Sequence, residues 1–211
     1  MRPPPLHCTI ALTIALIGAT GCSSILAPRP DPTHFFILSA SNAAPSGATQ
    51  PPTGALTIGL GPIGFPDYLA RAEIVSRTAD NRIDLAANDR WAEPLDVTFK
   101  RVLALDLSRA LEGAQVAEFP WFGSKPEFTY RIEATVDRFE SDAQNMAHLT
   151  ARWSIINGSD GRVLYSSASA LSVAAASTDR AAMATALSAA EDQFAIELAA
   201  ALERLHRSKV D

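Results

Sequence analysis

Residues 128–137 read Phe-Thr-Tyr-Arg-Ile-Glu-Ala-Thr-Val-Asp, so apolar and polar side chains alternate along the whole segment. Residues 147–156 repeat this alternation, and the turn-forming sequence Asn-Gly-Ser-Asp-Gly at 157–161 leads into a third such segment at 162–173. Alternation with a period of two is typical of a strand that buries one face. Short turns between such strands predict an antiparallel three-stranded meander.

Two amphipathic helices are predicted on either side of the meander in the chain. Pro94 precedes a series of apolar residues, 95–111, that recur every three or four positions, and Gly113 is placed to end this helix. A second apolar stripe with helical spacing runs through residues 183–205. The predicted fold class is therefore α+β, with two helices covering one face of a mostly antiparallel sheet.

Further strands are expected upstream of the first helix. Residues 73–77 and 82–85 resemble a hairpin, and residues 35–38 and 56–60 each resemble a single strand. Prolines and glycines at 61–69 predict a loop without regular structure, and residues 88–93 are expected to turn the chain toward the first helix.

Residues 19–24, Ala-Thr-Gly-Cys-Ser-Ser, follow an apolar run and a positive charge at Arg2, which is the order typical of a bacterial lipoprotein precursor. We expect residues 1–21 to be a signal peptide and Cys22 to become an acylated N-terminus. The apolar run is too short to span a bilayer as a helix. Two other interpretations remain: an ordinary secretory signal with a buried Cys22, or an uncleaved anchor. All three place the folded part outside the cytoplasm.

The expected organisation has three parts: the signal peptide, an anchored segment and one folded domain. The anchored segment, residues 22–55, contains the acylated cysteine, a proline-rich tether and a flexible loop. A single α+β domain is expected over residues 56–207. Ser23 stands where an aspartate would signal retention in the inner membrane, so the outer membrane, facing the periplasm, is the expected location.

Composition argues against several classes of function. The chain of 211 residues contains two cysteines, Cys8 and Cys22, so the mature domain has no thiol for a disulfide, a metal or catalysis. Its basic side chains are scattered rather than interleaved with aromatic residues, so no nucleic-acid partner is expected. No histidine pair has ligand spacing, and no nucleophile elbow is present. The glycines at 59–64 lack the following helix that a dinucleotide site requires. No catalytic, cofactor or metal site is predicted, and the chain is not expected to be an enzyme.

Aromatic residues near turns are the candidate partner contacts. Phe65 and Tyr68 lie in the predicted glycine-proline loop, and Trp121 and Phe122 follow Pro120. Each of these side chains could instead pack locally.

Asp106 is the acidic residue on the apolar stripe of the first predicted helix. It is either a buried functional carboxylate or a structural residue that lies at the edge of the stripe or pairs with Arg101 or Arg109. The stripe of the last helix is likewise either core or a surface for self-association or a partner.

Three ordered segments resemble the paraquat-inducible protein C (PqiC/YmbA-like) family of ABC-type transport auxiliary lipoproteins. Residues 60–75, Leu-Gly-Pro-Ile-Gly-Phe-Pro-Asp-Tyr-Leu-Ala-Arg-Ala-Glu-Ile-Val, resemble the family's G-P-V-x-L-P-x-Y-L-x-R-P-Q-I-V stretch. Residues 90–95 resemble its R-W-A-E-P-L box, and residues 116–121 resemble a short segment that ends in Pro-Trp. Phe65 replaces the usual leucine, and Ala72-Glu73 replaces Pro-Gln.

The resemblance implies a non-enzymatic adaptor in intermembrane lipid transport. It implies an outer-membrane lipoprotein that meets a periplasmic MCE-domain protein, within a system whose inner-membrane part is an integral protein or an ABC transporter. It also implies a ring-shaped homo-oligomer. Two other functions remain open for such an anchored domain. It could activate a periplasmic cell-wall synthase, or it could be a hydrolase, which would need a polar cluster in a pocket.

Overall fold

The computed structural model describes residues 30–42, 56–121 and 127–210, with side chains up to residue 208. The signal peptide, Cys22 and Phe122 therefore lie outside the described residues. The chain divides into two compact units, residues 1–32 and 33–211, and all helices and strands given below belong to the second unit.

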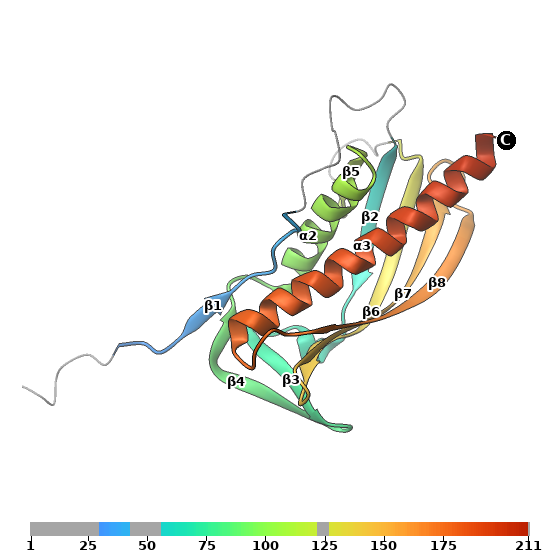
Figure 1. Cartoon of the computed structure of the whole chain (residues 1–211). Coiled ribbons are helices and arrows are strands. Elements are labelled where there is room, and N and C mark those ends of the chain that lie inside the picture. Colours follow the sequence, from blue (N-terminus) through green and yellow to red (C-terminus); the bar gives the residue numbers. More distant parts are fainter. Residues whose placement is uncertain (1–29, 43–55, 122–126, 211) are drawn as a thin grey trace, which may run out of the picture. The chain divides into compact units, whose positions relative to one another are not determined.

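Along the second unit, four strands precede α2 and four more strands precede α3, which is an α+β order (Figure 1). The elements are β1 (His34–Phe36), β2 (Thr57–Gly64), a 3₁₀ turn (Asp67–Leu69), β3 (Glu73–Ala79), β4 (Arg82–Trp91), α2 (Leu95–Ala110), β5 (Gln115–Glu118), β6 (Tyr130–Asp142), β7 (Met146–Asn157), β8 (Val163–Ala174) and α3 (Arg180–Val210).

The predicted meander is confirmed as β6, β7 and β8, which pair antiparallel over most of their length. Ile132 faces Ile155 across β6 and β7, and Ile155 faces Tyr165 across β7 and β8. Every second side chain of β6 is buried as far as Val136, because one face of the sheet carries the helices. The alternation of apolar and polar residues therefore determines where the strands form and which face of the sheet is buried in the core.

The other strands meet one side of β6 in a mixed arrangement. β2 pairs parallel with the first part of β6, with Ile58 opposite Tyr130, and β3 pairs parallel with its end, with Ser76 opposite Ser141. β5 pairs parallel with β2, and β1 pairs parallel with β4. The long ladders are antiparallel and the parallel ladders are short, so the sheet is mostly antiparallel as predicted. Its parallel contacts were not predicted.

Three strand predictions need correction. β2 does not end at Leu60 but continues to Gly64, because a shift in register between Leu60 and Ile63 lets the ladder with β6 resume beyond Pro62. Gly61 lies in this shift with φ +113°, a conformation that favours glycine. Residues 88–91 extend β4 instead of forming a turn, and the short strand β5 was not predicted.

Both predicted helices are confirmed, and both pack on the same face of the sheet (Figure 1). Gly113 follows α2 with φ +91° and donates its N–H to Ser108 O at 2.8 Å, as expected of a terminating glycine. No helix within the described residues is long and apolar enough to cross a membrane.

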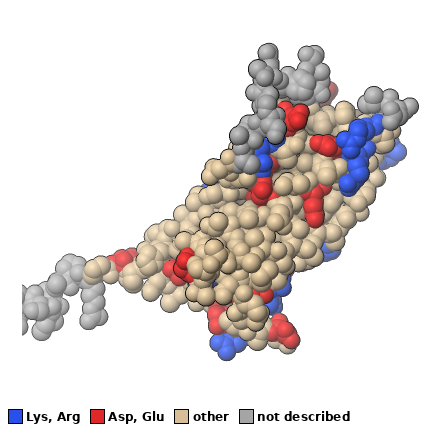
Figure 2. Space-filling view, viewed as in Figure 1, with Lys and Arg blue, Asp and Glu red and all other residues tan. Residues whose placement is uncertain are grey.

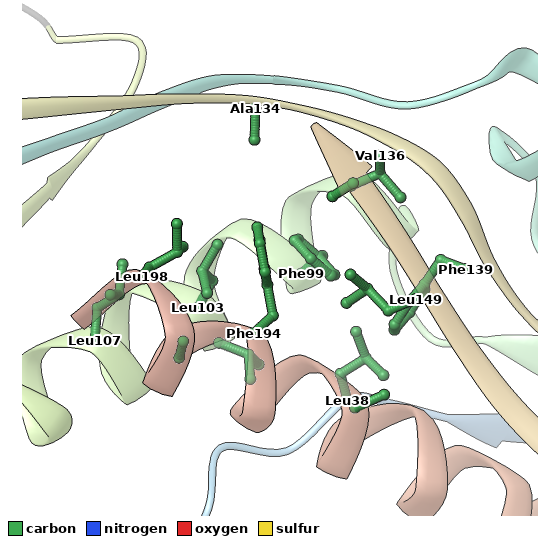
Figure 3. Close-up of a cluster of buried hydrophobic side chains, with 14 of the residues drawn as sticks. Leu38, Phe99, Leu103, Leu107, Ala134, Val136, Phe139, Leu149, Phe194 and Leu198 are labelled. Atoms are coloured by element: carbon green, nitrogen blue, oxygen red, sulfur yellow. The ribbon is translucent and has the colours of Figure 1, made fainter. Parts of the chain in front are cut away.

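Large apolar side chains from helices, sheet and N-terminal segment share one core (Figure 3). Phe99 of α2 is fully buried and makes edge-to-face contacts with Phe65 and Phe139, at centroid distances of 5.1 and 5.2 Å. Leu38, which follows β1, is buried in the same core. The N-terminal segment is thereby packed into the domain rather than only tethered to it.

Charge is unevenly spread over the helix-covered face. Figure 2 shows a broad uncharged area over the middle of this face and a group of Lys and Arg side chains at the C-terminal end of α3. The sequence accounts for this, because residues 181–190 of α3 contain no charged side chain.

Candidate functional site

Two segments that the family resemblance singles out meet at the N-terminus of α2. Trp91 N–H donates to Ala72 O at 2.7 Å, and Ala92 N–H donates to Phe36 O at 2.8 Å. These bonds join the ends of β1 and β4 to the start of β3. Between them lies a hollow of about 430 Å³, here named the junction groove; it is lined by Ala70, Arg71, Ala72, Trp91, Ala92, Glu93, Pro94, Leu95 and Asp96.

The junction groove has an apolar floor and a charged rim. Trp91 and Leu95 are buried, whereas Arg71 and Asp96 are exposed. Arg101 donates from both terminal nitrogens to the carboxylate of Glu93, and these hydrogen bonds hold the pKa of Glu93 below its usual value. A carboxylate is also favoured at the positive end of the α2 dipole. The groove can therefore receive an apolar side chain but holds no group set up for acid-base chemistry.

The structure places both loop aromatics in intramolecular contacts. Phe65 packs edge-to-face against Phe99, as described above. Tyr68 donates its hydroxyl to Glu140 Oε2 at 2.7 Å. Burial and the hydrogen bond to the Glu140 carboxylate raise the pKa of Tyr68 to about 12, so the phenol stays protonated at neutral pH. Neither side chain is presented freely to a partner.

Glu140 is the centre of a buried ionic cluster that ties this loop to the sheet. Its side chain is fully buried, and Oε1 accepts hydrogen bonds from Arg77 Nε and Arg138 Nε, each at 2.8 Å. The backbone N–H of Phe139 adds a further bond to Oε2. A buried carboxylate needs such partners to offset its lost hydration. The cluster thus positions the segment that leads into the junction groove.

Trp121 lies away from the loop aromatics. It packs against Phe119 and Phe128, with centroid distances of 5.2 and 4.8 Å, and its indole N–H donates to Ala117 O. It covers Gly59 near the start of β2, where an added Cβ would approach both Trp121 and Phe128 to 2.9 Å. Because Phe65 follows the end of β2, the structure does not bring the two predicted groups of contacts together.

The pairing of Asp106 with Arg109 is confirmed, at 3.2 Å. Asp106 is fully buried rather than at the edge of the stripe, and it also accepts the backbone N–H of Ser41 at 3.0 Å. Arg109 bonds in addition to Asp192 of α3. These contacts hold the N-terminal segment and both helices together.

Glu191 of α3 is a buried carboxyl that the sequence analysis missed. It is fully buried, and burial followed by the neighbouring Asp106 charge raises its pKa well above the ordinary value. Its position four residues after Leu187 and three before Phe194, on the apolar stripe, was the signal that could have identified it.

A hydrogen-bonded series Ser172, His148 and Asp142 crosses the open face of the sheet. Ser172 Oγ lies 2.8 Å from His148 Nδ1, and His148 Nε2 lies 2.7 Å from Asp142 Oδ2. His148 and Ser172 are direct neighbours across β7 and β8, and Ser172 is exposed. An acyl-transfer site would also need oxyanion donors and a pocket. We interpret the series as cross-strand bonding of an exposed sheet face.

Metal ligation finds no support in the described part of the chain, where no group of three or more His, Cys, Asp or Glu side chains could hold an ion.

Known proteins agree with the sequence motifs and with the fold. Intermembrane transport lipoprotein PqiC of Escherichia coli is 28% identical over 142 residues, which cover 67% of this chain and 71% of the relative. Two crystal structures share the fold. An uncharacterised protein has a TM-score of 0.66 at 22% identity, covering 81% of this chain and 98% of its own. Protein XCC0632 from Xanthomonas campestris has a TM-score of 0.64 at 20% identity, covering 79% and 93%. Residues 36–199 match the ABC-type transport auxiliary lipoprotein component, and the chain belongs to that family.

Proposed function

We propose that this protein is a non-enzymatic adaptor of an intermembrane lipid-transport system and that the junction groove receives a periplasmic MCE-domain partner. The family is one of transport auxiliary lipoproteins, and the related Escherichia coli protein is named as an intermembrane transport lipoprotein. A transport auxiliary component needs a surface for its partner rather than a reactive group. The described side chains with perturbed pKa values are held in structural contacts, which fits that role.

The junction groove carries the proposal. Residues 70–72 and 91–96 are far apart in sequence, yet they come together in one exposed hollow that is tied by backbone hydrogen bonds to the end of β1. Its buried Trp91 floor and its rim of exposed Arg71 and Asp96 suit a partner that inserts an apolar side chain and presents polar groups around it. The Glu140 cluster holds one wall in place, and the start of α2 forms the other.

The proposed anchor limits how far from the membrane the junction groove can meet its partner. In the proposed arrangement Cys22 is acylated and inserted in the outer membrane, and residues 23–32 act as the tether. About ten extended residues reach on the order of 30 Å. More than one acyl chain gives stable attachment, whereas a single chain binds reversibly. The groove would then face the periplasm within a fixed distance of the membrane.

Site-specific photocrosslinking in intact cells tests the proposal. A photoreactive amino acid at Arg71, on the rim, should capture an MCE-domain protein. The same amino acid at Thr135, exposed on β6, serves as the matched control and should not capture that protein. Capture of unrelated envelope proteins alone, or equal capture from both positions, would refute the docking site. Selective capture of a cell-wall synthase from Arg71 would favour the activator function instead.

A further inference from the structure

Two charge-free segments from opposite ends of the sequence meet on the helix-covered face. Residues 33–42 and residues 181–190 contain no Asp, Glu, Lys or Arg, although these residue types make up 19% of the chain. Ser39 N–H donates to Ser188 Oγ at 3.2 Å, which joins the two segments. A groove of about 390 Å³ lies between them. We name the surface of these two segments the N-terminal patch; it contributes to the uncharged area in Figure 2.

Large apolar side chains project from the first segment of the patch. Phe36 packs against the core and Leu38 is buried in it, so the residues that alternate with them turn outward. Phe35 is 64% exposed, and Ile37 is 47% exposed. Apolar residues that are exposed singly are common, but these two adjoin an uncharged groove. The patch is therefore a candidate surface for contact with an apolar phase.

The hydroxyl groups on the α3 side of the patch are bonded within the helix. Thr185 Oγ1 donates to Ala181 O at 2.9 Å, and Ser188 Oγ donates to Ala184 O at 3.0 Å. A polar group that is already hydrogen-bonded costs less to remove from water than a free one. This side of the patch can therefore lose its hydration at low cost.

Charged side chains that border the patch are paired. Asp192, at one end of the groove, bonds to Arg109 of α2. Arg180, which precedes the uncharged residues of α3, lies 3.4 Å from Asp89, and Asp89 is also 3.2 Å from Nδ1 of His34. Pairing lowers the cost of bringing such charges close to an apolar phase.

We propose that the N-terminal patch contacts the phospholipid bilayer that holds the anchor, with Phe35 and Ile37 entering its interfacial region. This inference rests on the proposed acylation of Cys22. At most about 45 Å of fully extended chain separates Phe35 from Cys22, so the bilayer is always within reach of the patch. The bilayer is favoured over a protein partner because the segment that carries both side chains is the one that continues to the anchor. Large apolar side chains on an otherwise uncharged face suit the boundary between headgroups and acyl chains.

The contact orients the domain on the membrane. An acylated tether limits only distance, whereas the patch determines which face of the domain lies on the bilayer. Ala92, in the junction groove, donates its N–H to Phe36 O at 2.8 Å, so the groove is held beside the patch and close to the membrane surface. Copies related by an axis normal to the bilayer all present the same patch to it, so the contact is compatible with a ring.

Fluorescence quenching by lipid tests the contact. The acylated Ile37→Cys chain, labelled with an environment-sensitive fluorophore, is placed in vesicles of phosphatidylethanolamine and phosphatidylglycerol that contain a nitroxide-bearing lipid. We expect blue-shifted emission and strong quenching, above the background of the labelled parent. Ile196→Cys, at a 51% exposed residue of α3 beyond the uncharged segment, is the matched control and should keep water-like emission. Water-like, equally weakly quenched emission from both positions, in chains that float with the vesicles, overturns the proposal.

A substitution tests the contribution of the apolar side chains. Phe35→Ser in the chain labelled at position 37 should lower the ratio of docked to undocked domains about tenfold, because apolar area that the bilayer covers is lost. Val163→Ser, at a 61% exposed residue of β8, is the control and should leave this ratio unchanged. Quenching that persists unchanged in Phe35→Ser contradicts the proposed contact. Photocrosslinking from Arg71 reports the adaptor role separately, so either proposal can fail while the other stands.

Discussion

Replacing Glu191 with glutamine tests whether the buried carboxyl between the two helices is protonated in the folded chain. Glu191 on α3 is fully buried beside Asp106 on α2, and Asp192 and Arg109 are the other charged groups that act on it. Burial and the two aspartates raise its pKa well above the ordinary 4.5, and Arg109 opposes them in part. At a pH between the unfolded and the folded pKa, Glu191 is therefore protonated in the folded chain and ionised in the unfolded chain.

The sign of the pH dependence follows from this difference. A carboxyl with a raised folded pKa stabilises the fold fully below the unfolded pKa, and that contribution is lost as pH rises toward the folded pKa. Each pH unit in this window corresponds to about 1.4 kcal/mol. Glu191→Gln keeps the size and the neutral charge but cannot titrate. The parent's free energy of unfolding, minus that of Glu191→Gln, should therefore fall as pH rises from roughly 5 toward the folded pKa, by at most about 1.4 kcal/mol per pH unit.

Urea unfolding followed by far-UV circular dichroism, in unit steps from about pH 5 to about pH 8, measures this difference. Asp192→Asn is the matched control, because it changes a half-buried neighbour and leaves Glu191 able to titrate. The control should retain most of the parent's pH dependence. Parallel curves for the parent and Glu191→Gln, or a difference that grows with pH, would show that Glu191 is ionised in the folded chain and would refute the reasoning.

Three further changes test the anchor, the core and the sheet. Cys22→Ala should abolish labelling by radioactive fatty acid, and unchanged labelling would contradict acylation at this residue. Phe99→Ala should lower the free energy of unfolding by about 3–5 kcal/mol in urea titrations; a loss below about 1 kcal/mol would contradict its central position. Gly59→Ala should lower the melting temperature because the added Cβ meets Phe128 at 2.9 Å, whereas Gly64→Ala, with 3.8 Å to its nearest neighbour, should be tolerated.

The elements that the sequence predicted correctly are those with strong local patterns. β6 alternates as far as Val136, β7 alternates as far as Ile155, and α2 is bounded by Pro94 and by Gly113. In each case the signal lies within a few neighbouring residues, so it does not depend on distant parts of the chain. Glu191 shows the limit of such patterns, because a charged residue on an apolar stripe looks like an exception until its surroundings are known.

The wrong or missing predictions concern segments whose structure depends on a distant partner. Gly61 and Pro62 suggest a loop, yet this part of β2 is a strand, because a register shift lets its pairing with β6 resume beyond Pro62. The short strand β5 exists because β2 provides an edge for it. The sequence left open whether Tyr68 packs locally, and the hydrogen bond that its hydroxyl donates to Glu140, more than seventy positions further on, comes only from the tertiary structure.

The sequence by itself determined the membership of the family, the meander and the two helices, and it predicts an anchor at Cys22, because each rests on residues that are adjacent or regularly spaced. Only the tertiary structure decided that β2 and β3 share one side of β6, that residues 70–72 and 91–96 build one groove, and that β8 is left as an open edge. The physical reason is that pairing and burial are properties of surfaces that meet in space. Local periodicity specifies which face of a strand or helix is apolar, but not which distant face will cover it.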